Sequence, residues 1–444
     1  MQRRIVELSH INKSFPGVKA LDDVSFDLNE GEVMALIGEN GAGKSTLMKI
    51  LSGVYQPDSG EIKVFGVTVE GLTPKKVQEL GIAIIHQELN MCTHLTVAEN
   101  IFLGREKTKG MVLSASEMNR EARNILERLG MDIDPETVVG DLAVSKQQMV
   151  EIAKALSANA RILIMDEPTS ALTSREISDL FAIIRKLRDT GCGIVYISHR
   201  LEELQHIADR VSIMRDGRRI TTGDFSSFTM DSMIANMVGR EIKEKFPKVQ
   251  CGVGKVILKV EKLNAGRMVR NISFELHEGE IVGVAGLMGA GRTEMTRVIF
   301  GADARESGQI FLDGQPVEIR CPQDAIRTGI VLVPEDRKRD GLCTKLSIRD
   351  NVALPNLDIL CGRLGAVHRR KERRMVWQTQ KDLTVKMHDI EANAGSLSGG
   401  NQQKLVLGKW LARNSRVVMF DEPTRGIDVA AKVEIYHLMN ELKK

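Results

Sequence analysis

The stretch GENGAGKST at residues 38–46 decides the fold, and a second version of it, GLMGAGRTE, stands at residues 286–294. The two are separated by an offset of 286 − 38 = 248 residues. The same offset relates the Glu-Gly-Glu triplets at 30–32 and 278–280. A constant offset across several motifs is typical of an internal repeat. We therefore expect one domain that occurs twice.

The second halves of the two copies are related by a slightly larger offset. The sequence DEPT at 166–169 recurs at 421–424, an offset of 255. Because the offset grows by 255 − 248 = 7, about seven residues have been added to copy two, between Asp336 and Leu397.

These alignments predict the domain boundaries. Copy one is expected at 1–240 and copy two at 256–444, joined by a short polar linker at 241–255 that contains a proline and two glycines. Copy two has no counterpart of residues 193–240, so we expect it to be incomplete at its C-terminus.

The bulk composition excludes several classes of protein. A net charge of +3 over 444 residues leaves no basic excess for nucleic acid. The 6 cysteines lie far apart, without the spacing of metal ligands, which indicates reduced thiols in the cytosol. We find no secretory signal and no apolar run long enough for a bilayer, so any membrane role is expected to act through partner subunits.

Periodic apolar patterns predict an α/β fold. Short apolar runs at 33–37, 161–165 and 193–197 are typical of buried parallel strands. Between the first two of these runs, the apolar residues Met149, Ile152, Ala153 and Leu156 recur at helical spacing. Strands that alternate with helices indicate an α/β domain.

The loop of copy one has the form Gly-x-x-x-x-Gly-Lys-Ser, between a buried strand and a helix-forming run. Its backbone N–H groups can hold phosphates, Lys44 can reach the β and γ phosphates of ATP, and Ser45 can ligate Mg²⁺. The predicted nucleotide-binding residues of this loop are Gly38, Glu39, Asn40, Gly41, Ala42, Gly43, Lys44, Ser45 and Thr46.

Two acids end the predicted strand at 161–165, at the edge of the sheet where such folds bind ligands. Asp166 is expected to hold Mg²⁺, and Glu167 to orient or deprotonate the attacking water. Paired acids are commonly just solvated surface, but the apolar strand before them and Pro168-Thr169 after them argue against that.

Taken together, these residues resemble the ATP-binding cassette superfamily over essentially the whole chain. The resemblance implies two P-loop NTPase domains, each with a mainly parallel sheet core and a helical subdomain. Gln87 then stands in the glutamine loop, which senses Mg²⁺ and water, His199 senses the γ-phosphate, and Phe15 stacks on adenine. The alternatives are a structural histidine at 199 and packing of Phe15 beneath the loop.

In this family two cassettes close head to tail on ATP, and each site joins the loop of one copy to the signature Leu-Ser-Gly-Gly-Gln of the other. Copy two carries LSGGNQQ at 397–403. The resemblance therefore assigns nucleotide contacts to Ser398, Gly399, Gly400 and Asn401, and to the D-loop aspartate Asp428.

The two copies differ at these positions. Copy one has Ala143 and the branched Val144 where the signature needs serine and glycine. Copy two has Arg292 for Lys44 and Glu335 for Gln87, and an arginine does not fit the loop as a lysine does. We therefore expect one hydrolytic site and one degenerate site, the latter built from Gly286, Gly291, Arg292, Thr293, Glu335, Asp421 and Glu422.

The asymmetric set of motifs, with PEDRK at 334–338 and DEPTRGID at 421–428, is similar to tandem ATPases of bacterial monosaccharide importers, those for ribose, galactose, arabinose, xylose or allose. That resemblance implies an ATPase, with ATP and Mg²⁺ as cofactors, at the cytoplasmic face of the inner membrane as a peripheral protein. Its implied partners are two membrane permease subunits and, through them, a periplasmic sugar-binding protein, with no nucleic acid.

Two other classes remain as alternatives. A soluble tandem cassette acting on ribosomes or nucleic acid usually has a long charged linker and two intact signatures, which this chain lacks. A nucleotide-binding module without turnover conflicts with the presence of both Glu167 and His199.

Overall fold

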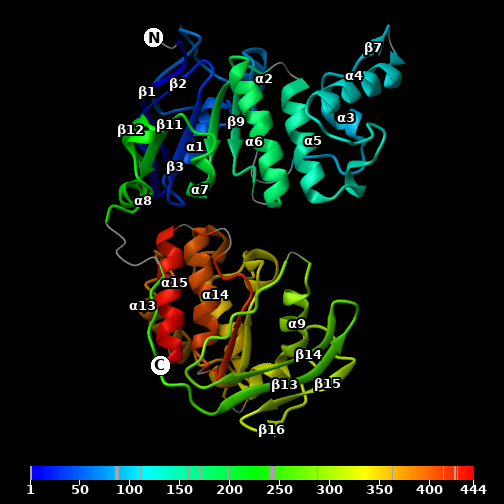
Figure 1. The fold of residues 1–444 in the computed structure, drawn as a ribbon. Coiled ribbons are helices and arrows are strands. Elements are labelled where there is room, and N and C mark those ends of the chain that lie inside the picture. The colour runs from blue at the N-terminus through cyan, green and yellow to red at the C-terminus, as the bar shows by residue number, and fades with distance from the viewer. Residues whose placement is uncertain are drawn as a thin grey trace. The chain divides into compact units, whose positions relative to one another are not determined.

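The computed structural model describes residues 3–85, 90–110, 112–157, 160–169, 172–198, 200–240, 246–287, 289–362, 364–413, 415–424, 427 and 429–444. Gln87, His199 and Asp428, to which the sequence assigns functions, lie outside these residues. The chain divides into two compact units, Met1–Ile242 and Lys243–Lys444, which are taken in turn (Figure 1).

Unit 1 contains an antiparallel sheet in the order β2-β1-β4-β5. Apolar side chains on one face of this sheet share a single core with helix α1 and with the second sheet of the unit. The strands are β1 (Arg4–Phe15), β2 (Val18–Asn29), β4 (Ser59–Val64) and β5 (Val67–Thr68), and α1 is Lys44–Leu51.

The second sheet of unit 1 has the order β12-β11-β3-β10-β9-β6, and every neighbouring pair whose register is given is parallel except β11 with β12. All residues of β3 and β10 are buried, which is why their sequences are continuous apolar runs. The strands are β3 (Val33–Gly38), β6 (Ile82–Ile85), β9 (Ile162–Asp166), β10 (Gly193–Ile197), β11 (Arg210–Arg215) and β12 (Arg218–Asp224). The predicted strands at 33–37, 161–165 and 193–197 are confirmed.

A helical part of unit 1 has its own small core, formed by α3, α4 and α5. The predicted helix between Met149 and Leu156 lies within α5. The helices are α2 (Pro74–Glu79), α3 (Val97–Phe102), α4 (Ala115–Arg128), α5 (Val144–Ser157), α6 (Ser174–Asp189), α7 (Leu201–Leu204) and α8 (Met230–Val238), and a hairpin β7 (Thr108–Lys109) and β8 (Val112–Leu113) precedes α4.

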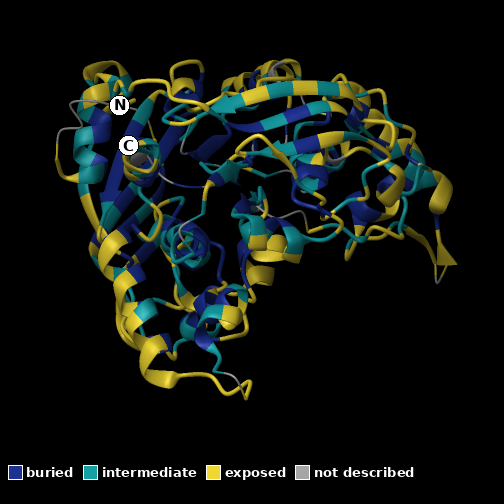
Figure 2. Ribbon diagram, turned by 90° about the horizontal axis from the view of Figure 1, so that it is seen from below, coloured by how far each residue is buried: buried dark blue, intermediate teal, exposed yellow. Residues whose placement is uncertain are grey.

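Unit 2 repeats this plan, with an antiparallel sheet β14-β13-β15-β16 and a parallel pair β17-β18. The buried residues of each unit, dark blue in Figure 2, gather on strands and on the inner faces of helices. The strands are β13 (Val256–Ala265), β14 (Val269–His277), β15 (Ser307–Leu312), β16 (Gln315–Pro316), β17 (Ile330–Val333) and β18 (Val417–Phe420). The helices are α9 (Arg292–Ile299), α10 (Pro322–Thr328), the π-helix η3 (Arg337–Gly341), α11 (Ile348–Ala353), α12 (Leu357–Leu360), α13 (Arg369–Leu383), α14 (Gly399–Leu411) and α15 (Val429–Lys443).

The two units differ at the strand that leads into the loop. In unit 1 this strand, β3, lies between β11 and β10 and is fully buried. The corresponding residues 281–286 form no strand, and Ile281 is 54% exposed. A strand forms when neighbours satisfy its backbone N–H and C=O groups. Within the described residues of unit 2 nothing pairs with 281–286, so the segment stays irregular.

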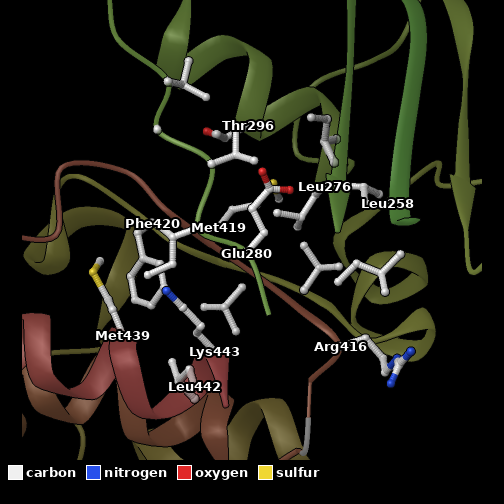
Figure 3. Close-up of a pocket in the computed structure, with 18 of the residues that line it drawn as sticks. Leu258, Leu276, Glu280, Thr296, Arg416, Met419, Phe420, Met439, Leu442 and Lys443 are labelled. Atoms are coloured by element: carbon white, nitrogen blue, oxygen red, sulfur yellow. The ribbon is translucent and has the colours of Figure 1, made fainter. Parts of the chain in front are cut away.

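A cavity of about 640 Å³ lies between this segment, β18 and α15. Figure 3 shows Met419 and Phe420 of β18 and Leu442 of α15 among its lining side chains. In unit 1 the equivalent place, between β3 and β9, is filled by β10. The cavity therefore lies at the place that corresponds to β10 of unit 1, and much of its lining is apolar.

Candidate active site

The phosphate loop of unit 1 joins β3 to α1. Gly43 caps the start of α1 with a φ of 96°, in the left-handed region that favours glycine. A Cβ atom there would lie 2.6 Å from the carbonyl oxygen of Ala20, so no other residue fits. Lys44 Nζ donates hydrogen bonds to the carbonyl oxygens of Gly38 (2.8 Å) and Glu39 (2.9 Å). The loop thus holds an ammonium group beside the positive end of a helix, as a phosphate requires.

Two candidate metal ligands meet at the loop of unit 1. Ser45 Oγ donates a hydrogen bond of 3.4 Å to Oδ2 of Asp166, at the end of β9. Burial raises the pKa of Asp166 above its ordinary 3.8, the charge of Glu167 raises it further, and Lys44 lowers it. A hydroxyl and a desolvated carboxylate suit Mg²⁺, because a cation offsets the cost of the buried negative charge. The third predicted ligand, Gln87, lies outside the described residues.

The candidate base Glu167 has an unusual backbone. Its φ is 50°, in the left-handed region, and its N–H donates to the carbonyl oxygen of Ile197 at 2.9 Å. Non-glycine residues in this region are strained, and such strain gathers at functional sites. Glu422, at the same position of copy two, has a φ of 42°. Both copies therefore hold this acid in the same conformation.

A cluster of hydrogen bonds around the buried Glu203 was not predicted from the sequence. Glu203 of α7 accepts hydrogen bonds from the Thr169 hydroxyl (2.7 Å), from the Tyr196 hydroxyl (3.3 Å) and from Arg200 (3.1 Å). These contacts join the segment after Glu167 to the segment after β10, so Glu203 fixes one relative to the other. Only Arg200 is a close neighbour of Glu203 along the chain, and Thr169 is 34 residues away, so the sequence does not show that these groups meet.

Phe15, the predicted adenine contact, ends β1 and is half-buried. Its ring lies edge to face with that of Tyr55, with 5.2 Å between centroids and an angle of 66° between planes. Lys13 Nζ lies 5.7 Å from its centroid. Contact with Tyr55 agrees with packing near the loop, and stacking on adenine stays a prediction.

The loop of unit 2 has the same turn but different chemistry. Gly291 caps α9 with a φ of 87°, and a Cβ there would lie 2.7 Å from the Met268 carbonyl oxygen. Arg292, in the place of Lys44, donates from Nη2 to Oε1 of Glu422 at 3.1 Å. The loop cation of copy two is therefore paired with the acid at the catalytic position.

The other residues predicted for the degenerate site are placed by the elements beside them. Asp421 follows β18 and is buried, and its N–H donates to the Val333 carbonyl oxygen at 2.9 Å. Thr293 follows Arg292 in α9. Glu335 follows β17, where Gln87 follows β6 in copy one. Gly286 is the first residue of the loop and ends the irregular segment.

The signature of copy two opens helix α14. Ser398 is the N-cap of α14 and is exposed, with Gly399 and Gly400 as the first helical residues. The Asn401 amide donates to Ser398 Oγ at 2.9 Å, and its oxygen accepts from the Lys386 N–H at 2.8 Å. Because Asn401 donates to the oxygen of Ser398, the hydroxyl hydrogen remains able to donate to an anion. This helix start suits a phosphate.

The corresponding start of α5 in copy one is built differently. Ser145, in the position of Gly400, forms a hydrogen bond with Glu176 that lowers the pKa of that carboxyl. Ala143 has no hydroxyl. One contact is shared by both copies: Gln147 donates to the Leu142 carbonyl oxygen at 2.9 Å, as Gln402 does to that of Leu397 at 3.0 Å. Copy one therefore keeps the glutamine hydrogen bond at the start of the signature helix but lacks the groups of copy two that could bind an anion.

Both signature helices contact the segment after the glutamine-loop position. In unit 1, Glu151 of α5 accepts from the Asn90 backbone, and burial raises its pKa to about 7. In unit 2, Lys409 of α14 donates to the Gly341 carbonyl oxygen at the end of η3, and burial lowers its pKa to about 8. A hydrogen bond therefore joins each signature helix to that segment.

Replacing Asp166 by Asn is expected to stabilise unit 1 at neutral pH in the absence of nucleotide and Mg²⁺. The pKa of Asp166 is raised in the folded state, so as the pH rises this carboxyl loses its proton in the unfolded chain before it does so in the folded protein. The free energy of unfolding therefore falls as the pH rises past 3.8. Removing the charge should raise the midpoint of thermal unfolding by about 2–4 °C, the shift for about 1 kcal/mol in a unit of this size.

Calorimetry of both proteins from pH 4 to pH 8 measures this effect. The increase in the midpoint of thermal unfolding should vanish toward pH 4. Mg²⁺ with ATP should stabilise the original protein more than the Asn variant. A variant that melts lower than the original protein at pH 7 would show that burial of Asp166 is not costly.

None of the helices in the described part of the chain has the length and apolar character needed to cross a membrane.

Comparison with known proteins identifies close relatives. The family model described as ABC transporter matches residues 21–170 and again residues 269–425. The ribose/galactose/methyl galactoside import ATP-binding protein 1 of Agrobacterium fabrum is 51% identical over 439 residues, which are 99% of this chain and 87% of that protein. A protein of the same name from Burkholderia lata is also 51% identical, over 441 residues, covering 99% of this chain and 86% of the relative.

Among solved structures, a nucleotide-free ATP-binding cassette from an ABC transporter is 28% identical, with a TM-score of 0.48. The match covers 53% of this chain and 95% of the cassette.

Proposed function

Since the chain belongs to the ABC transporter family and is an ATPase with two cassettes, we propose that it hydrolyses ATP to power import of a monosaccharide of the ribose and galactose type. The sugar class comes from the names of relatives that are 51% identical over nearly the whole chain.

One observation carries the proposal of catalysis: Lys44, Ser45, Asp166 and Glu167 meet where the parallel strands β3 and β9, which lie on either side of β10, end. Lys44 binds the β and γ phosphates, and Ser45 and Asp166 hold Mg²⁺. Bound there, Mg²⁺ would neutralise charge on the phosphates. Glu167, held in place by the Ile197 carbonyl oxygen, orients the attacking water and accepts its proton.

We further propose that unit 1 performs most of the turnover, with the Ser398-Gly399-Gly400 signature donated by copy two. The pairing of Arg292 with Glu422 supports this asymmetry, because the guanidinium occupies a carboxylate oxygen that would otherwise orient the attacking water. The degenerate site then binds nucleotide and turns over slowly. ATP drives closure only if it binds the closed arrangement of the two copies better than the open one. A signature that contacts the nucleotide only in the closed arrangement provides this difference in affinity.

The proposed partners are two membrane permease subunits and a periplasmic sugar-binding protein, with the chain at the cytoplasmic face of the inner membrane. The segments after Gln87 and Glu335 would transmit closure to the permease. Contacts of Glu151 and Lys409 with these segments support that role, because they join each signature helix to the coupling segment.

Reconstitution of the chain with its permease subunits in proteoliposomes tests this function. We expect ATP turnover to rise several-fold when a sugar-loaded binding protein is added, with uptake of labelled ribose or galactose that depends on ATP. An unloaded binding protein is the control. Stimulation by ribosomes or nucleic acid, without any response to the loaded binding protein, would favour the soluble alternative.

A further inference from the structure

Helix α13 begins with a dense run of cations. Arg369, Arg370, Lys371, Arg373 and Arg374 are all exposed. The one acid within the run, Glu372, points the other way: it is 3% exposed and accepts from Arg349 Nη1 at 2.9 Å. The exposed start of α13 therefore carries only positive side chains, and we call these five residues the basic face.

The chain does not neutralise the basic face. Among the hydrogen bonds and ion pairs of the described residues, none involves the guanidinium groups of Arg369, Arg370, Arg373 or Arg374, while Lys371 bonds only to the Ile359 carbonyl oxygen, at 2.7 Å. Cations crowded on one turn repel each other, so such a cluster favours a partner that brings negative charge.

Exposed apolar side chains border the basic face. Trp377 lies four residues after Arg373, hence on the same side of α13, and is 47% exposed. Leu364 is 98% exposed, in a hairpin closed by a bridge between Cys361 and Val367 just before the helix. Cations beside an exposed tryptophan and leucine are typical of protein surfaces that insert at a membrane–water interface.

Copy one provides an internal comparison, because its helix α4 stands at the equivalent place after the hairpin β7-β8. Helix α4 carries Arg120, Arg123 and Arg128, but it also carries three glutamates. Arg123 lies 3.8 Å from Asp134. Positive and negative side chains are thus equal in number on the exposed helix α4, whereas positive side chains are in excess on α13.

We propose that the basic face of α13, with Leu364 and Trp377, binds the anionic headgroups of phospholipids at the membrane surface. Positive side chains attract negative headgroups by about 1 kcal/mol each near such a surface, and an inserted tryptophan and leucine add apolar burial. The surface holds unit 2 against the leaflet independently of the permease. The inference goes beyond sugar import and does not depend on the transported substrate.

Sedimentation of the full chain with vesicles tests the proposal. The original protein should bind vesicles of phosphatidylglycerol mixed with phosphatidylcholine, release them in high salt, and bind vesicles of phosphatidylcholine alone far more weakly. Replacing Arg370 and Arg374 by Gln together should weaken binding about 25-fold, since about 1 kcal/mol per charge is about fivefold. Trp377→Ser should weaken binding to the mixed vesicles at low salt, although it leaves the charge of the basic face unchanged.

The matched control is Arg120→Gln with Arg123→Gln on α4, which should change binding less than about twofold. The proposal would be overturned if this control lost as much vesicle binding as the α13 double variant, or if the original protein bound neutral vesicles as strongly as mixed ones. A short duplex DNA that displaces the protein from mixed vesicles would also overturn it, in favour of a nucleic-acid surface. Thermal melts of both double variants should match that of the original protein, because all four side chains are exposed.

Discussion

Replacing Glu167 by Gln is expected to lower ATP turnover by about 10²–10⁴-fold, the range for loss of a general base. The left-handed backbone of Glu167 and its hydrogen bond to Ile197 aim this carboxylate from the end of β9, beside Asp166. Glutamine keeps the shape but cannot accept the proton of the attacking water. Nucleotide binding should remain, so the variant should accumulate bound ATP.

Glu422→Gln in copy two is the matched control. This acid has the same backbone conformation, but its carboxylate is already paired with Arg292. We expect total turnover to change less than about fivefold, because exposed ion pairs of this kind contribute little. Phosphate release and binding of a fluorescent ATP analogue, measured on both variants with permease present, separate catalysis from affinity. Equal loss in the two variants would contradict a single hydrolytic site.

Replacing Lys44 by Ala should remove both nucleotide affinity and turnover, the latter by at least about 10²-fold, as expected for a lost charged donor at a phosphate. In unit 1 this ammonium is enclosed by the carbonyl oxygens of Gly38 and Glu39. Lys44→Arg should not restore activity, because a guanidinium is larger and planar.

Arg292→Ala tests the same position in copy two. The partner of Arg292 is a side chain and not the loop backbone, and both members of the pair are partly exposed. We therefore expect a partial effect, less than about tenfold on turnover. Photolabelling with an azido-ATP, followed by mapping to unit 1 or unit 2, measures each site separately. Loss of all labelling in unit 1 on changing Arg292 would argue against separate roles for the two loops.

Much of the fold follows from patterns in the sequence. The strands β3, β9 and β10 are runs of apolar residues, and each of these was predicted because a buried parallel strand needs apolar side chains on both faces. The start of α1 was equally readable, since Gly43 and Lys44 belong to one short motif. Such features depend on neighbours along the chain, which a sequence displays directly.

The functions assigned to Gln87, His199 and Asp428 stay predictions, because these residues lie outside those that the structure describes. Their assignment rests on the family resemblance alone. The roles of Phe15 and of Ser398 are likewise predictions, and the exposed position of Ser398 at the N-cap of α14 agrees with its role.

The sequence by itself determined that a phosphate loop occurs twice and that the second copy has an arginine where the first has Lys44. Only the tertiary structure decided what that arginine does: Arg292 reaches Glu422, 130 residues away, and pairs with it. Likewise the cluster at Glu203 and the irregular segment at 281–286 depend on strands from distant parts of the chain. The physical reason is the distance along the chain over which each interaction acts. Helices and strands are specified by neighbouring residues, whereas ion pairs and strand pairing depend on which distant elements the fold brings together.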